Sequence, residues 1–257
     1  MPGRVPLPKA AEEAIFLVSE ADRAGLLLRI LGGTGVYVHC TKFRPLLQAL
    51  GREPGDIDLV SYFKFNKTGK IEALLQDAGY VGRDRFNALH GRTRLIFDDP
   101  ANNTHLEVFF DELKMCHTVK FADRLELDQP TVTLADLFLS KMQIVQLNEK
   151  DTKDAIVMFR EHDVGDTDKE CINAEHVAKE LAADWGFWYT VTTNLGKVRD
   201  SVGQYKTLSE EDREDVLKKM DTLKQRIDSE PKKMKWTMRA RIGAKTSWYQ
   251  SVDEARQ

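Results

Sequence analysis

The sequence predicts a protein of the α/β (α+β) class, in which a small mixed-sheet core precedes a helical domain. As far as residue 110, short apolar runs typical of strands alternate with stretches of helical spacing, a pattern that indicates a mixed layer of helices and strands. From residue 134 onward the apolar residues recur only at helical spacing. Hydrophobic residues make up 42% of the 257 residues, which is enough to form a core.

The first half is expected to begin with a helix and to continue as β-α-β-α and then as a β-meander. We predict helices over residues 9–24, 43–50 and 71–78, and strands over residues 26–30, 57–65, 85–89, 93–97 and 105–110. The glycines from Gly32 to Gly35 predict a tight turn after the first strand, and His90-Gly91 predicts a hairpin.

The second half is expected to hold helices over residues 134–147, 154–162, 174–184, 187–198 and 209–228. Ser209 as the N-cap, with Asp212 three residues into the helix, predicts a start close to a capping box. The expected organisation is therefore a core over residues 1–128, a helical domain over 129–230 and a basic, aromatic tail over 231–257.

Composition excludes several classes of protein. The formal net charge of −3 does not predict nucleic-acid binding by the whole molecule, although local patches could still bind nucleic acid. Cys40, Cys116 and Cys171 lie far apart without CxxC spacing, which argues against a disulfide scaffold and a structural zinc site and favours inert or buried thiols. Because the sequence shows no targeting segment and no apolar run long enough to span a bilayer, we expect a cytoplasmic protein with no membrane partner.

Asp56 and Asp58 are the first candidate site residues. They lie two apart near the start of a predicted strand, so both carboxylates should share one face while Ile57 points into the core. Two carboxylates on one face repel each other unless a cation lies between them, and hard oxygen ligands suit Mg²⁺. The alternative is a pair of solvated acids in a turn, because an isolated Asp-x-Asp is a weak motif.

Gly32, Gly33 and Thr34 are candidates for binding phosphate. The missing side chains of the glycines let a phosphate approach backbone N–H groups, and the threonine hydroxyl can add a contact. An ordinary tight turn is the alternative.

Glu107 is the candidate for a third carboxylate at the same site. It lies inside an apolar strand, where a charged group needs a partner, and a metal ion shared with Asp56 and Asp58 would provide one. The alternative is a solvent-facing position on a half-exposed strand.

Lys141 is a further candidate, in the helical half of the chain. It lies in an otherwise apolar helix, where a lone ammonium group is costly unless it meets an anion such as a nucleoside triphosphate. One alternative is a lysine whose charged end reaches solvent at the helix edge. In the other, Lys150, Asp151 and Asp154 form a local ion-pair network that holds two helices together.

The Gly-Gly turn, the Asp-x-Asp on a strand and the single carboxylate on a later strand together resemble the DNA polymerase beta-like nucleotidyltransferase superfamily. The resemblance covers roughly residues 26–160. Lys141 and the Lys150-Asp151-x-x-Asp154 segment resemble its abortive-infection branch, which includes the nucleotidyltransferase toxins of bacterial toxin–antitoxin pairs.

The resemblance implies a metal-dependent enzyme that moves a nucleoside monophosphate from a nucleoside triphosphate to a hydroxyl group and releases pyrophosphate. It implies that two Mg²⁺ or Mn²⁺ ions are held by Asp56, Asp58 and Glu107, which are then also the catalytic residues. The nucleotide would be bound by Gly32, Gly33, Thr34, Lys141 and Lys150.

The sequence departs from the family pattern in two places, and both bear on the acceptor. The gap between Gly33 and Asp56 is longer than in minimal members, and its loop carries Arg44 and Arg52. The usual Gly-Ser is replaced by Gly-Gly-Thr.

Three acceptors remain open: an RNA 3′ end such as that of tRNA, a protein side chain, and a small molecule such as an aminoglycoside. The tail favours RNA, because residues 231–247 carry six cations and Trp236, with Trp248 directly after them. A solvated or self-docking tail is the alternative. The resemblance also implies an antitoxin protein as a possible partner. A non-catalytic binding module with the same fold, and a phosphodiester hydrolase, are the competing functions.

The histidines and the aromatic cluster over 184–189 are expected to have structural roles. No HxxxH or HExxH spacing occurs, so His39, His90, His105 and His117 do not predict a catalytic zinc site. Aromatic residues at helical spacing more often form a core than a platform for bases.

Overall fold

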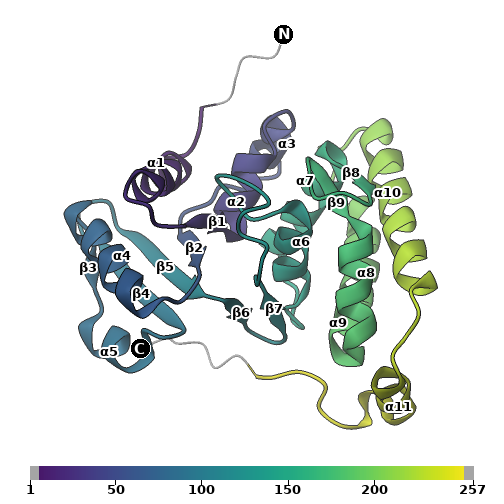
Figure 1. Ribbon diagram of the computed structural model, residues 1–257. Helices are drawn as coiled ribbons and strands as arrows, with labels where there is room; N and C mark the ends of the chain where they lie inside the picture. Colours follow the sequence, from purple (N-terminus) through teal and green to yellow (C-terminus); the bar gives the residue numbers. More distant parts are fainter. Residues whose placement is uncertain (1–5, 252–257) are drawn as a thin grey trace. The chain divides into compact units, whose positions relative to one another are not determined.

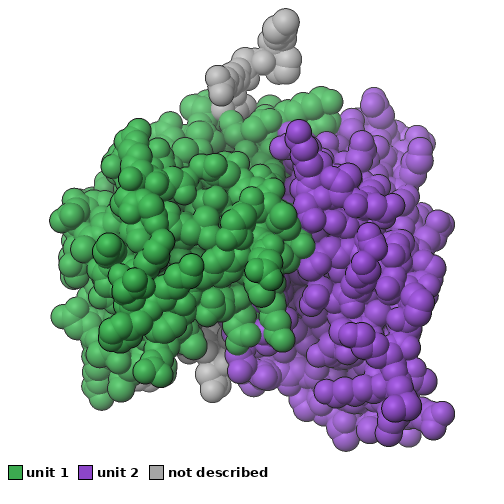
Figure 2. All heavy atoms as spheres, viewed as in Figure 1, with its two compact units in different colours: residues 1–113, 120–133 green, residues 114–119, 134–257 purple. Residues whose placement is uncertain are grey.

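The computed structural model describes residues 6–251 and divides into two compact units, coloured separately in Figure 2. Unit 1 comprises residues 1–113 and 120–133, and unit 2 comprises residues 114–119 and 134–257. The predicted fold class, a mixed sheet followed by a helical region, is confirmed. The first residues of the predicted core and the last of the predicted tail, 1–5 and 252–257, lie outside the described part.

Unit 1 contains five helices and a five-stranded sheet within its described residues (Figure 1). The helices are α1 (Lys9–Arg23), α2 (Gly32–His39), α3 (Arg44–Ala49), α4 (Phe65–Asp77) and α5 (Asp84–His90). The strands are β1 (Arg29–Leu31), β2 (Ile57–Ser61), β3 (Val81–Gly82), β4 (Arg94–Asp99) and β5 (Thr104–Phe110). Two short strands, β6 (Glu112–Lys114) and β7 (Thr118–Lys120), pair with each other where the chain passes from one unit to the other.

The strand order in the sheet is β1-β2-β5-β4-β3. β2 and β5 run parallel, and the other neighbouring pairs run antiparallel. A parallel pair needs a crossover connection, which the chain supplies between β2 and β5 with α4, β3, α5 and β4. This crossover places two strands that are distant in the sequence side by side at the centre of the sheet.

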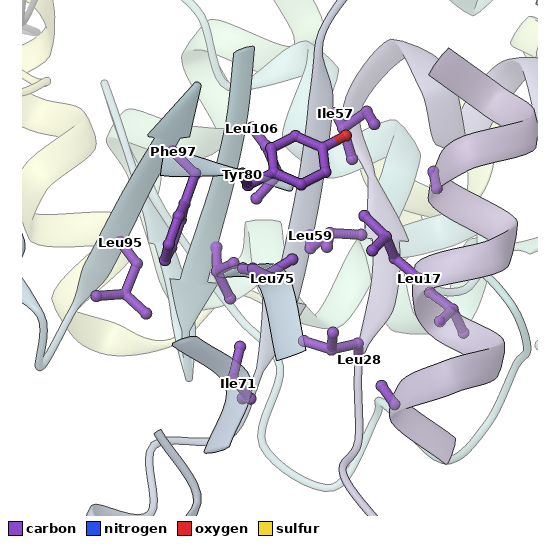
Figure 3. Close-up of a cluster of buried hydrophobic side chains, with 14 of the residues drawn as sticks. Leu17, Leu28, Ile57, Leu59, Ile71, Leu75, Tyr80, Leu95, Phe97 and Leu106 are labelled. Carbon is purple, nitrogen blue, oxygen red and sulfur yellow. The ribbon is translucent and has the colours of Figure 1, made fainter. Parts of the chain in front are cut away.

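One face of this sheet forms the hydrophobic core of unit 1 (Figure 3). Ile57 and Leu59 of β2 lie on it beside Leu106 and Val108 of β5, because alternate residues of a strand share a face. Buried residues of α1 and α4, such as Leu17, pack against these strands. The residues between them in the sequence therefore lie on the opposite face.

The prediction of a strand over residues 85–89 is wrong, because this segment lies in helix α5. The hairpin predicted at His90-Gly91 is absent for the same reason. The edge of β4 is instead occupied partly by β3 and partly by Asn87, whose side chain both accepts from the N–H of Ile96 (2.8 Å) and donates to its carbonyl (3.1 Å). An asparagine amide carries both a donor and an acceptor, so it can mimic a neighbouring strand at one position.

The tight turn predicted from Gly32 to Gly35 is also replaced by helix, since α2 begins at Gly32 directly after β1. In addition, β2 begins at Ile57, so Asp56 precedes the strand instead of lying within it.

Unit 2 is mainly helical. Its helices are α6 (Leu134–Met142), α7 (Glu149–Glu161), α8 (Ala174–Ala183), α9 (Trp185–Val202), α10 (Glu210–Ser229) and α11 (Met234–Ile242), followed by the 3₁₀ helix η1 (Gly243–Lys245). The strands β8 (Asp163–Gly165) and β9 (Cys171–Asn173) form a short parallel pair. All five helices predicted here are present, although α6 ends five residues early and α7 starts five residues early.

Local sequence sets the starts of these helices. The N-cap side chains of Asn148, Asn173, Asp184 and Ser209 each accept a hydrogen bond from the first turn of the helix that follows. The capping box predicted at Ser209 is confirmed, since the carboxylate of Asp212 accepts in return from the backbone N–H of Ser209.

All three cysteines are buried, as expected for structural thiols. Among the described residues, none of the helices combines the length and the apolar character that crossing a membrane requires.

Candidate active site

The crossover in unit 1 brings Asp58 and Glu107 together. They are register partners on the parallel strands β2 and β5, so their Cα atoms lie side by side. Because Ile57 and Leu59 face the hydrophobic core, Asp58 lies on the opposite face of the sheet, together with Glu107. Two of the three predicted carboxylates thus share one face of the sheet.

The first turn of α2 lies directly against the carboxylate of Asp58. Leu31, at the end of β1, is the register partner of Asp58 on its other side, and Gly32 follows it with φ of +67°. A Cβ atom on Gly32 would collide with the Asp58 carboxylate. Glycine is the residue that tolerates this left-handed backbone, and here it also leaves the space that the carboxylate occupies.

Thr34 ties this helix to the start of β2. Its hydroxyl is buried and donates a hydrogen bond to the backbone carbonyl of Asp56 (2.7 Å). A hydroxyl has one proton to donate, so in this arrangement Thr34 positions Asp56 instead of donating to a phosphate. Asp56 itself is exposed, at the edge of the site formed by Asp58 and Gly32. The predicted phosphate contact of Thr34 stays a prediction.

Arg52, which the sequence places in the loop between Gly33 and Asp56, lies beside the glycines of the candidate site. Its guanidinium lies so close to Gly33 that a Cβ atom there would collide with it, and the residue is only 7% exposed. It donates to the carbonyl of Glu53 (3.0 Å). A guanidinium matches the geometry of phosphate oxygens, so the glycine turn predicted to bind phosphate has a cation beside it.

Glu107 has cationic partners on the sheet. Arg94 forms an ion pair with one of its carboxylate oxygens, and Nε2 of His105 donates to the same oxygen (2.9 Å). Burial alone would raise the pKa of Glu107, but the hydrogen bonds from His105 and Arg94 outweigh it and hold that pKa below its ordinary value. Glu107 is therefore a carboxylate at neutral pH.

His105 links Glu107 to a second acid. Its Nδ1 donates to Asp98 (2.9 Å), which also accepts from Nε of Arg83 (2.7 Å). The hydrogen bond with Glu107, opposed by burial and supported by Asp98, raises the pKa of His105 to about 9. The histidine expected to have a structural role thus contacts two acids of the sheet, one of them the candidate ligand Glu107. Its position two residues before Glu107 on a strand, hence on the same face, was the available signal.

Asp56 and Asp58 carry carboxylate oxygens, the type of ligand that suits a divalent cation. Mg²⁺ is commonly held by one or two carboxylates together with substrate phosphates and water. Asp58 lies in the cradle left open by Gly32, and Thr34 holds the backbone of Asp56 next to it. Within residues 6–251, however, no group of three or more His, Cys, Asp or Glu side chains is arranged to hold a metal ion. Glu107 would have to exchange its pairing with Arg94 and His105 to become a third ligand.

Lys141 and Lys150 belong to unit 2. The ammonium group of Lys141 pairs with the carboxylates of Asp151 (2.8 Å) and Asp154 (3.0 Å), which joins α6 to α7. These two acids supply the anionic partner that a lysine in an apolar helix requires. The ion-pair network considered as an alternative therefore exists, with Lys141 as its cation, while Lys150 is exposed in the first turn of α7. A phosphate contact of either lysine stays a prediction.

No protein-family model and no curated protein matches the chain. Among solved structures, it is similar to an antigenic nucleotidyltransferase-like protein from Paracoccidioides brasiliensis, with 15% identity, a TM-score of 0.42, and coverage of 91% of this chain and 100% of the other. A second is a putative nucleotidyltransferase from Helicobacter pylori, with 11% identity, a TM-score of 0.38 and coverage of 86% and 98%. A third is a tRNA-processing enzyme, with 14% identity, a TM-score of 0.30 and coverage of 91% and 62%.

Proposed function

We propose that unit 1 is the core of a metal-dependent nucleotidyltransferase, which transfers a nucleoside monophosphate from a nucleoside triphosphate to a hydroxyl group. The observation that carries this proposal is the placement of Asp58. It lies beside Glu107 on a parallel strand and against the first turn of the helix that begins at Gly32. A carboxylate site next to a glycine-rich helix start combines a place for a cation with backbone N–H groups for phosphate oxygens.

In this proposal Asp56 and Asp58 hold a divalent cation, which when bound neutralises charge on the triphosphate and on the acceptor oxygen. The N–H groups at Gly32 and Gly33 and the guanidinium of Arg52 bind the β- and γ-phosphates. The acceptor oxygen forms a bond to the α-phosphorus and gives its proton to a carboxylate of the site. The bond from the α-phosphorus to the bridging oxygen breaks, and pyrophosphate leaves with that electron pair. Most of the rate comes from alignment and charge neutralisation.

The direct test is label transfer. The protein is incubated with each α-labelled nucleoside triphosphate, Mg²⁺ and, separately, total RNA, protein extract or small-molecule extract. We expect label in one fraction and stoichiometric pyrophosphate. Asp58→Asn should reduce transfer at least about a hundredfold, because the site loses a charge that acts on the reacting groups. Asp77→Asn, which changes an exposed acid at the end of α4, is the matched control and should keep full activity.

A non-catalytic binding module is the second candidate, and the ion pair between Glu107 and Arg94 favours it. Nucleotide binding without label in any fraction, with the wild type equal to Asp58→Asn, would decide for this candidate. Label released as free nucleoside monophosphate together with pyrophosphate, and in no acceptor fraction, would identify a hydrolase instead.

The fraction that carries the label also separates the proposed acceptors, an RNA 3′ end, a protein and a small molecule. The abortive-infection branch and an antitoxin partner are finer proposals that rest on Lys141 and the segment from Lys150 to Asp154. Arrest of growth on expression in bacteria, abolished by Asp58→Asn, would support them.

A further inference from the structure

The basic segment, residues 231–247, contains six lysines and arginines and no acidic residue. It belongs to unit 2 and includes α11 and η1 (Figure 1). The segment is positively charged, whereas the formal net charge of the whole chain is −3. The segment is therefore a local cationic feature of an acidic protein.

One face of α11 packs on unit 2. The indole N–H of Trp236 donates to the carbonyl of Leu181 (3.1 Å), and its ring meets that of Trp188 edge to face, with centroids 5.1 Å apart. The guanidinium of Arg239 lies 4.7 Å from the ring centroid of Trp185. The self-docking tail considered from the sequence is thus present, and it fixes the orientation of α11.

Trp248 anchors the chain after η1. Its indole N–H donates to the hydroxyl of Thr190 (3.1 Å), and its ring packs edge to face on Tyr189. A side chain at Gly186 would collide with the carbonyl of Trp248. Both tryptophans of the tail are half-buried and therefore serve in packing.

The outward face of α11 is apolar. Met234 is 80% exposed, Met238 60% and Ile242 48%, and their spacing of four residues places them in one stripe along the helix. At about 100° per residue, Lys235 lies on one side of this stripe and Arg241 on the other. Lys233 directly precedes the helix, and Lys245 follows in η1. We call this surface the α11 face.

The α11 face combines an exposed apolar stripe with cations on both of its flanks. Large exposed apolar side chains cost free energy in water, and these three are contiguous. Cations on both flanks of an apolar stripe let the aliphatic side chains enter an apolar layer while the charges stay at its polar edge. This is the arrangement of helices that lie in a membrane interface.

Other occupants fit less well. A second copy of the chain would bring two cationic faces together. A groove that encloses a helix requires access to most of its circumference, but Trp236 and Arg239 hold one side of α11 against unit 2. RNA would pair with the cations but would leave the methionine and isoleucine side chains in water. A flat, anionic surface with an apolar layer beneath it satisfies both parts of the α11 face.

We propose that the α11 face binds the surface of an anionic phospholipid bilayer, with α11 parallel to the membrane plane. Met234, Met238 and Ile242 enter the boundary between headgroups and acyl chains. The exposed cations Lys233, Lys235, Arg241 and Lys245 contact lipid phosphates. The expectation of no membrane partner came from the absence of a spanning segment, and surface binding requires none.

The test is co-sedimentation of the full chain with vesicles of phosphatidylcholine alone or with 30% phosphatidylserine. We expect binding only to the anionic vesicles, and weaker binding at 0.5 M salt than at 0.1 M, because salt screens the cations. The triple variant Met234→Ser/Met238→Ser/Ile242→Ser should lower the partition coefficient about tenfold or more. Lys235→Gln/Arg241→Gln should lower it about 25-fold, since each cation near an anionic surface contributes about fivefold.

Matched variants control for the general loss of apolar area and charge. Phe65→Ser/Leu89→Ser removes side chains that are 89% and 72% exposed in unit 1 and should leave the partition coefficient unchanged. Lys70→Gln/Arg85→Gln removes two exposed cations there and should also have little effect. Thermal unfolding checks that each variant is folded. We expect all of them to fold, because the substituted residues are exposed.

Three outcomes would overturn the proposal. The first is wild-type protein that sediments with neither kind of vesicle or equally with both. The second is triple-serine protein that binds anionic vesicles as the wild type does. The third is competition by soluble glycerophosphoserine, or tight binding of single-stranded RNA with no binding of vesicles, since either would identify an anion site without an apolar layer.

Discussion

Gly32 and Gly51 have nearly the same left-handed backbone, with φ of +67° and +66°, but different surroundings. A Cβ atom at Gly51 would meet nothing within 4 Å, whereas one at Gly32 would collide with the carboxylate of Asp58. Alanine at either position costs about 1 kcal/mol in backbone strain. We predict that Gly32→Ala loses transfer activity as well, because Asp58 must move, while Gly51→Ala keeps it.

The comparison of these two variants separates strain from displacement of the carboxylate. Chemical denaturation gives the free energy of unfolding of each, and label transfer gives the activity. If both variants lost activity equally, or if Gly32→Ala kept it, the close contact of Gly32 with Asp58 would not matter for function.

At this scale the carboxylates were predictable and their neighbours were not. Asp58 was found from its spacing of two from Asp56 near a predicted strand, and Glu107 because a charged residue inside an apolar strand requires a partner. Arg94 and Arg52 reach the site only through the pairing of β4 with β5 and through the fold of the long loop after α3. Neither has a signal within its own stretch of sequence, since exposed arginines are common on any surface.

At the scale of the elements, Lys141 of α6 joins this helix to α7 through its ion pairs with Asp151 and Asp154. The side chain of Lys141 is only 12% exposed, and those of Asp151 and Asp154 are 10% and 1% exposed. Removing one partner of such a buried network leaves uncompensated charge, which typically costs about 3–5 kcal/mol. We predict that Lys141→Met lowers the free energy of unfolding by about this amount, measured by chemical denaturation.

Lys153 on the same helix is the matched control. It pairs with Glu149 one turn away, and that acid is 69% exposed, so Lys153→Met should cost well below 1 kcal/mol. The triple variant Lys141→Met/Asp151→Asn/Asp154→Asn should recover part of the stability, since it leaves no unpaired charge. A Lys141→Met protein of unchanged stability but lost activity would favour the phosphate contact instead.

The longer strands and most of the longer helices were predicted from their local patterns, whereas several short elements were not. The helices of unit 2 have long apolar repeats and N-caps such as Ser209, which are visible in the sequence. The segment over 85–89 is short, and Asn87 fixes it as helix through bonds to Ile96 on β4. The strands β8 and β9 span three residues each, too short for any periodicity to appear.

At the scale of the whole molecule, the free energy of unfolding changes with pH through groups whose pKa differs between the folded and unfolded states. His117 is one of them: Nε2 bonds to the hydroxyl of Thr190 (2.8 Å), and the ring stacks on Phe187 with centroids 5.0 Å apart. Burial lowers the pKa of His117 below its ordinary value of 6.5, and Asp184 opposes this only in part. The folded protein therefore holds His117 neutral at pH values where the unfolded chain protonates it.

The sign of the effect follows from this difference. Above pH 6.5 both states hold the neutral ring, and the contribution of His117 to stability is fully present. As the pH falls below 6.5, the unfolded chain binds the proton before the folded protein does. The contribution of His117 to stability therefore decreases until the pH reaches the pKa of His117 in the folded state. Each unit by which the pKa is lowered corresponds to about 1.4 kcal/mol.

His105 titrates with the opposite sign, because its pKa is raised to about 9, and it partly masks His117 in the wild type. The difference in the free energy of unfolding between the wild type and His117→Gln does not contain the contribution of His105, since His105 is the same in both. We predict that His117→Gln is less stable than the wild type at pH 8, that the gap stays constant down to about pH 6.5, and that it narrows from there to pH 5. Denaturation at four pH values in this range measures the gap. A gap that stays constant all the way down to pH 5 would mean that His117 is not held neutral by its surroundings, and that the packing of Phe187 and Thr190 around it tolerates a charge.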